Sequence, residues 1–168
     1  MAMSMYQASV PLLARMLANL NNFLNKAAKH CEEKKIDPGA ILNARLYPDM
    51  FHLIKQVQVA TDTAKGGVAR LAGQEPPVYE DTEKSFADLA ARIEKTIAFI
   101  NTFKPGQIDG TEEKEITLKM RAGEVKFKGQ AYLQNFVYGN FYFHVTTAYA
   151  ILRHNGVEVG KRDFLGPN

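Results

Sequence analysis

The stretch Gln130–His154, QAYLQNFVYGNFYFHVTTAYAILRH, decides the fold of this chain. Apolar and aromatic side chains cover almost its whole circumference, and the Asn155-Gly156 pair that follows is a typical signal for a helix C-terminus. A helix that is apolar on nearly all sides must be covered by other parts of a structure. We therefore expect this segment to be the central helix of a core, or to be shared with a second copy of the chain.

Before this helix, the hydrophobic pattern changes from a helical period to strict alternation. Apolar and polar side chains alternate through residues 116–120 and again through residues 124–128, on either side of Ala122-Gly123. This pattern predicts a β-hairpin with one apolar face. Lysine and glutamate are mixed on its polar face, which is typical of a solvated strand surface, and we expect no nucleic-acid binding there.

Three further helices are predicted upstream of the hairpin. The first starts at Ser4 or Ser9 and ends before Asp37-Pro38-Gly39, and the second starts at Pro48-Asp49. The third carries an apolar stripe from Phe86 to Ile100. The tail, Val157 to Asn168, has no periodicity and is expected to lie over the surface. The fold class predicted is mainly α, a four-helix bundle with a β-hairpin inserted between helices 3 and 4.

Composition limits the classes of protein to consider. The 168 residues are 46% hydrophobic and 23% charged, as in ordinary globular domains. The lone cysteine, Cys31, excludes an internal disulfide, extends the apolar stripe of the first helix and suits a reducing compartment. A net charge of +3 is too small to indicate nucleic-acid binding, and no apolar run is long enough for a membrane span. We expect a single domain over residues 1–168, located in the cytoplasm.

His144 is the most informative residue of the central helix. At about 100° per residue it lies in the middle of an apolar stripe that includes Phe141 and Ala148, with Asn140 and Thr147 on its flanks. A buried imidazole without a partner is costly. Two explanations stay open: a core histidine satisfied by Asn140, a tyrosine or a backbone carbonyl, or a histidine that serves a pocket or a ligand.

Other polar residues are further candidates. Gln58 and Asp62 are four residues apart and share a helix face, where they line the mouth of a pocket or are simply solvated. Tyr149 is a third candidate pocket residue. His52 is expected to point away from the core, and His154 to complement the dipole at a helix C-terminus.

Four stretches of the chain carry a resemblance to a known family. They are Leu46–Met50 (LYPDM), Gln56–Asp62 (QVQVATD), Phe141–Gly156 (FYFHVTTAYAILRHNG) and Lys161–Gly166 (KRDFLG). On these residues, the chain resembles a family of unknown function within the DinB/YfiT-like superfamily of metalloenzymes. The similarity covers nearly the whole chain and is specific for that family.

The resemblance implies a DinB-like four-helix bundle that is often dimeric. Metal-binding members of the superfamily place one histidine on the second helix and a His-x-x-x-His pair on the fourth. Characterised relatives include transferases and isomerases that use low-molecular-weight thiols. By this likeness His144 is the first ligand of the pair, and the cofactor implied is a divalent metal, zinc or nickel.

The chain departs from that ligand pattern at two places. Ala148 stands four residues after His144 and cannot bind a metal, while on the second helix the matching stretch brings Gln58 or a neighbour to the ligand position. Asp62 offers a substitute oxygen ligand. Because zinc sites use at least three protein ligands, the sequence predicts a degenerate metal or small-molecule pocket centred on His144.

Two functional hypotheses follow, and they leave open whether the chain is an enzyme. The first is a small-molecule transferase or hydrolase in which His144 is a general base or metal ligand, oriented by Asn140, Gln58 or Asp62. The second is a non-catalytic binding or stress-related homodimer whose site has decayed, and Ala148 is the feature that favours it.

Overall fold

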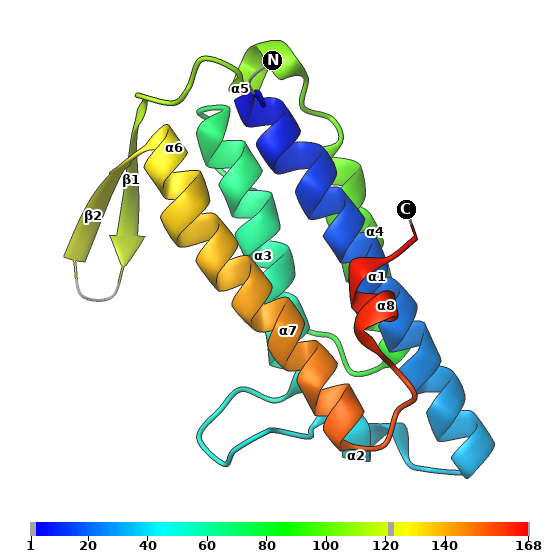
Figure 1. Ribbon diagram of the computed structural model, residues 1–168. Coiled ribbons are helices and arrows are strands. Elements are labelled where there is room, and N and C mark those ends of the chain that lie inside the picture. Colours follow the sequence, from blue (N-terminus) through cyan, green and yellow to red (C-terminus); the bar gives the residue numbers. More distant parts are fainter. Residues whose placement is uncertain (1–2, 121–122, 168) are drawn as a thin grey trace.

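Four long helices lie side by side in the structure, a computed structural model that describes residues 3–120 and 123–167 (Figure 1). They are α1 (Met5–Lys34), α3 (Leu53–Leu71), α4 (Phe86–Ile100) and α7 (Tyr138–His154). The described residues also form four short α-helices, α2 (Pro38–Leu42), α5 (Pro105–Ile108), α6 (Gly129–Ala131) and α8 (Lys161–Leu165), and a π-helical segment that is described below. The predicted mainly helical class is confirmed. Among the described residues, no helix combines the length and the apolar character that crossing a bilayer requires.

Local capping explains where two of the long helices begin. The Ser4 hydroxyl accepts from the backbone N–H of Gln7, and the Gln7 side chain accepts from the backbone N–H of Ser4, so the first helix starts at the earlier of its two predicted positions. Ser85 and Asp88 form the same reciprocal cap at α4. Ser9, the other predicted start, is buried inside α1 and donates to the Met5 carbonyl.

The helix α3 begins later than the Pro48-Asp49 pair predicts. Residues 44–53 form a loop that is closed by a hydrogen bond of 3.1 Å from the Leu53 N–H to the Ala44 carbonyl. Inside it, the Arg45 side chain donates to the Met50 carbonyl at 2.6 Å. These contacts occupy backbone groups that a longer helix would need, so the helix starts at Leu53.

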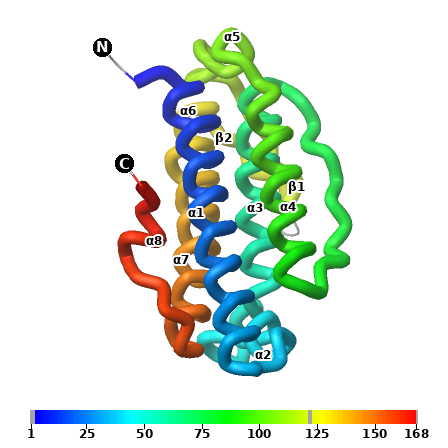
Figure 2. Tube along the Cα trace, turned by 90° about the vertical axis from the view of Figure 1, so that its right-hand side faces the viewer, coloured from blue at the N-terminus to red at the C-terminus, as the bar shows by residue number. Residues whose placement is uncertain are grey.

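A long crossover joins α3 to α4. It runs back along the outside of these helices, so that α3 and α4 point in the same direction while α1 and α7 point the other way (Figure 2). α3 packs against both α4 and α7, and α1 packs against α4 and α8. The core between these helices is made of buried aliphatic and aromatic side chains, among them Leu17, Phe23, Leu89 and Phe141.

The hairpin lies between α5 and α6 in the chain order. β1 (Glu115–Met120) and β2 (Gly123–Lys128) pair antiparallel, with Ile116 opposite Phe127 and Leu118 opposite Val125. Ile116 and Leu118 are buried, whereas Val125 is 39% exposed, so only part of the apolar face is covered. Residues 121 and 122 of the predicted turn lie outside the described residues. The hairpin projects from one side of the helices (Figure 1).

The sequence pattern predicted one continuous helix over Gln130–His154, but the structure is not α-helical throughout this stretch. A π-helical segment, η1 (Tyr132–Val137), connects α6 to α7. The buried residues 129, 133, 137 and 141 repeat every four positions, and on an α-helix such a repeat drifts by about 40° per step. The wider π turn takes up this drift and keeps these positions on one face. It also brings Val137 against Gly67 of α3, where an added Cβ would lie 2.9 Å from Val137 Cγ1.

We expect Gly67→Ala to destabilise the protein by about 1–2 kcal/mol, because overpacking at Val137 exceeds the gain in helix propensity. Gly66→Ala is the matched control, since the added Cβ there meets only the flexible end of Arg70, and it should be neutral or stabilising. Chemical denaturation measures both. If both substitutions changed the unfolding free energy equally, the close approach of Val137 to Gly67 would be contradicted. Adding Val137→Ala should restore part of the stability that Gly67→Ala loses.

Candidate functional site

His144 lies on α7 and faces α3. The residue is 8% exposed, and its Nδ1 lies 2.7 Å from Oε1 of Gln56, which is itself buried. Burial lowers the pKa of His144, so the ring is neutral at pH 7. Because an amide oxygen can only accept, Nδ1 carries the proton and donates it to Gln56. The other nitrogen, Nε2, therefore holds the free lone pair.

The orientation of the Gln56 amide is set by a second contact. Its Nε2 donates to the backbone carbonyl of Phe51 at 3.0 Å, in the loop before α3. With the amide nitrogen bound to that carbonyl, the amide oxygen must face His144. Gln56 thus links the loop, α3 and α7 through one buried side chain.

One aromatic ring lies against His144. The Phe143 ring meets the His144 ring edge-on at 5.2 Å between centroids, and Phe143 is 55% exposed. Ala148, one helical turn further along α7, is completely buried. The chemistry available at the site is that of one neutral imidazole with a fixed tautomer beside an exposed aromatic ring.

The donor set around His144 does not fit a zinc or nickel ion. The imidazole has an amide oxygen as its partner, and Ala148 supplies no ligand atom. Within residues 3–120 and 123–167, no three His, Cys, Asp or Glu side chains lie close enough together to hold a metal ion. Zinc sites need at least three protein ligands, most often from these residue types.

The structure brings two other predicted site residues together elsewhere. Gln58 donates to Glu83 at 2.8 Å, and Asp62 pairs with Lys65 at 2.8 Å and with Arg92 at 3.1 Å. Gln58 is two residues after Gln56, about 200° around the helix, so it faces the crossover and α4 while Gln56 faces α7.

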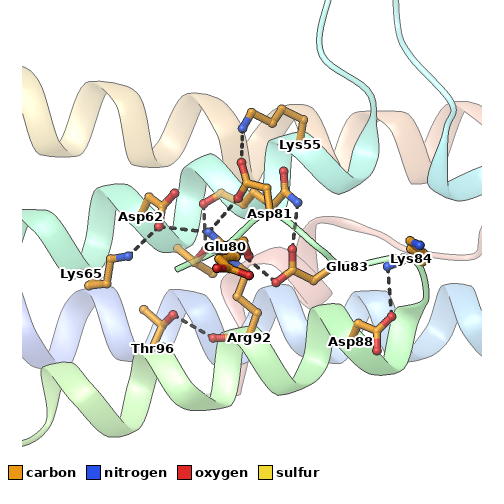
Figure 3. Close-up of polar contacts among 12 residues, drawn as sticks. Lys55, Asp62, Lys65, Glu80, Asp81, Glu83, Lys84, Asp88, Arg92 and Thr96 are labelled. Carbon is orange, nitrogen blue, oxygen red and sulfur yellow. Dashed lines mark hydrogen bonds and ion pairs between the residues drawn. The ribbon is translucent and has the colours of Figure 1, made fainter. Parts of the chain in front are cut away.

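Arg92 is the central residue of this second cluster (Figure 3). Its guanidinium is nearly fully buried and donates to the Thr61 hydroxyl at 2.9 Å. It also donates to the Glu80 carbonyl and to the Glu83 carboxylate, each at 3.0 Å. Its Nη2 makes ion pairs with Asp62 and Asp81 without hydrogen-bond geometry. The cluster ties the crossover to both α3 and α4.

Two open cavities adjoin the Arg92 cluster. One, of about 590 Å³, is lined by Tyr79, Glu80, Arg92 and Lys95 among others. The other, of about 450 Å³, includes Gln58 and Asp81 in its lining. Neither is lined by His144. The two groups of polar residues are therefore separate features of the molecule.

Asn140 and Tyr149 contact residues other than His144. Asn140 donates to the Phe136 carbonyl at 2.7 Å, within its own helical segment. Tyr149 packs edge-on against Phe23 of α1 and Phe164 of α8. His52 is half-buried at the start of α3, where burial, Arg45 and Lys55 lower its pKa.

Sequence reasoning missed Gln56 and Arg92, although each stands among apolar residues at helical spacing. Gln56 stands between Leu53 and Ala60 at helical spacing, and Arg92 stands three residues after Leu89. A polar residue on a buried stripe must find a partner, which is the same signal that singled out His144.

Comparison with known proteins identifies the family. The chain is similar to a crystal structure of a DinB family member protein from Shewanella denitrificans, with 41% sequence identity and a TM-score of 0.90 over 97% of this chain and 92% of that chain. None of the curated proteins matches the chain. Residues 5–165 match the model of the family described as a domain of unknown function, DUF1993. The chain belongs to this DUF1993 family, and its likeness to the DinB family member agrees with the predicted DinB-like relationship.

Proposed function

We propose that the chain is a single-domain DinB-like four-helix bundle, with its hairpin between the third and fourth long helices, that binds a small molecule at Nε2 of His144 without a metal ion. The observation that carries this proposal is the 2.7 Å contact between His144 Nδ1 and Gln56 Oε1, which leaves Nε2 as the free lone pair. A cytoplasmic location is part of the proposal and is supported by the single buried thiol of Cys31.

The geometry suits a ligand that carries a hydrogen-bond donor. A hydroxyl or thiol group would donate to Nε2 of His144, and the exposed Phe143 ring offers an apolar surface next to it. If the ligand transfers its proton to Nε2, the resulting imidazolium is stabilised by the Gln56 oxygen at Nδ1. This is the arrangement of a general base in a transferase or hydrolase.

A second candidate function is a non-catalytic homodimer with a decayed site. It is supported by Ala148 and by aromatic side chains that the core does not cover, since Tyr47, Phe51 and Phe143 are 66%, 50% and 55% exposed. Sedimentation measures the oligomeric state, and a monomer at all concentrations would refute the dimer.

Substitution of His144 distinguishes the two functions. We expect phenol or 2-mercaptoethanol, used as neutral donor probes, to shift the His144 ring signals saturably in NMR spectra, and His144→Ala to abolish saturable binding. His144→Ala also leaves the Gln56 oxygen unpaired and should cost about 1–3 kcal/mol of stability. His154→Ala, at the exposed end of the same helix, is the control. The second candidate would be favoured if His144→Ala lost stability and no probe shifted the His144 ring signals of the unchanged protein.

A further inference from the structure

The two hydrogen bonds of the buried Gln56 amide also join separate parts of the fold. Its oxygen accepts from His144 on α7, and its nitrogen donates to the Phe51 carbonyl in the preceding loop. The residue is 1% exposed, so water has little access to take over either contact. An imidazole with one nitrogen held in this way is restricted in both its ring orientation and its tautomer.

A bound metal ion would impose the same two restrictions on a histidine, because it orients the ring and occupies one nitrogen. The side chains present do not fit a metal, since Gln56 faces His144 and Ala148 follows one turn later. A polar contact, the one between Gln56 and His144, nevertheless joins α3 and α7 at this point.

We infer that Gln56 is the positioning residue of His144, and that its side-chain amide orients the imidazole as a bound metal ion would. Gln56 holds the proton on Nδ1 of His144 and directs the lone pair of Nε2 away from α3. The inference rests on the proposed function for its chemical meaning, because the lone pair it directs is the proposed ligand-binding group.

The tautomer of His144 tests the inference directly. Nitrogen-detected NMR of the full chain should show His144 protonated at Nδ1. Gln56→Leu removes the acceptor and should shift the population toward the Nε2-protonated form by about tenfold or more, as loss of one net hydrogen bond implies. Gln56→Glu keeps an acceptor and should retain the Nδ1 proton. Gln58→Leu, which acts on the opposite face of α3, is the matched control and should leave the tautomer unchanged.

Each result of this experiment supports or overturns the inference. A proton on Nε2 in the unchanged protein would overturn it, and this measurement needs no variant to fold. An unchanged tautomer in folded Gln56→Leu would also overturn it. If His144 has the expected tautomer and yet no probe binds at Nε2, the proposed ligand function fails while the positioning role of Gln56 stands.

A gain-of-metal variant tests the same geometry independently. In untagged protein, the pair Gln56→His and Ala148→His would supply two imidazoles beside His144, and we expect one Co²⁺ or Zn²⁺ to bind at least about 100-fold more tightly than to the unchanged chain. The Co²⁺ absorption spectrum reports the ligands. Tight binding of either metal to His144 of the unchanged chain would overturn the inference, and so would a folded double variant that gains no affinity.

Discussion

Replacing Gly129 with alanine is expected to destabilise the protein by about 3 kcal/mol, which corresponds to a fall in melting temperature of roughly 6–12 °C for a chain of this size. A Cβ at this position would overlap with the backbone carbonyl oxygen of Thr111, and a backbone atom cannot turn aside as a side chain can. The chain approaches itself closely here because the next residue, Gln130, donates its N–H to the Glu112 carbonyl at 2.9 Å. The substitution would force the base of the hairpin away from α6.

Gly139→Ala is the control for this prediction. Gly139 lies in α7 with no atom near the added Cβ, so alanine should stabilise the helix by about 0.5–1 kcal/mol. Thermal and chemical denaturation of both variants give the comparison. If Gly129→Ala is as stable as the unchanged chain, the close packing of the hairpin base on the 111–112 turn is refuted.

The existence of the long helices and several of their ends could be predicted because caps and periods are local properties. Ser4 and the Asn155-Gly156 pair mark ends that the structure places within a residue of those signals, and the apolar stripe from Phe86 to Ile100 has the same bounds as α4. The short helix α8 could not be predicted in this way. It is held by contacts with α1, where Asn19 donates to the Phe164 carbonyl at 3.0 Å and Lys26 pairs with Asp163 at 2.6 Å. Such tertiary contacts leave no periodic signal in the sequence.

The candidate site could be predicted in part. His144 stood out because an imidazole on an apolar stripe needs a partner, and the structure supplies one in Gln56. The identity of that partner depends on the rotation of α7 about its own axis. A π segment such as Tyr132–Val137 changes the rotation of the helix that follows it relative to a continuous α-helix, and an α-helical pattern does not reveal it. Gln58 and Gln56 are both polar, and only the three-dimensional arrangement shows which of them faces α7.

Replacing Arg92 with methionine is expected to cost about 3–4 kcal/mol of stability at neutral pH. Methionine keeps the apolar stem of the side chain but removes the donors to Thr61 and Glu80 and the charge between three carboxylates. Breaking a buried ion pair on one side typically costs about 3–5 kcal/mol. The carboxylates of Asp62 and Asp81 are 42% and 38% exposed, so solvent screens them and the lower part of that range applies.

The cost of Arg92→Met should depend on pH. Burial alone would raise the pKa of Glu83, but hydrogen bonds from Gln58 and Arg92 overcome this and hold it below its usual value. A carboxyl with a lowered pKa stabilises the fold at pH values above its unfolded pKa, and this stabilisation disappears as the pH falls through the folded pKa. Arg92→Met removes part of that stabilisation. The difference in unfolding free energy between the two proteins should therefore be largest near pH 7 and shrink below about pH 4.

Lys95→Met is the matched control on the same helix. Lys95 is exposed, and its ammonium group lies 4.2 Å from the centre of the Tyr79 ring, a contact worth about 0.5–1 kcal/mol. Urea denaturation at several pH values separates the two variants, because only Arg92→Met should show a pH-dependent cost. If both variants lost the same small amount of stability at every pH, the crossover would be held by its cation–π contacts alone. A large loss confined to Arg92→Met, with a shallower dependence of stability on pH, is expected if the buried guanidinium joins the crossover to α3 and α4.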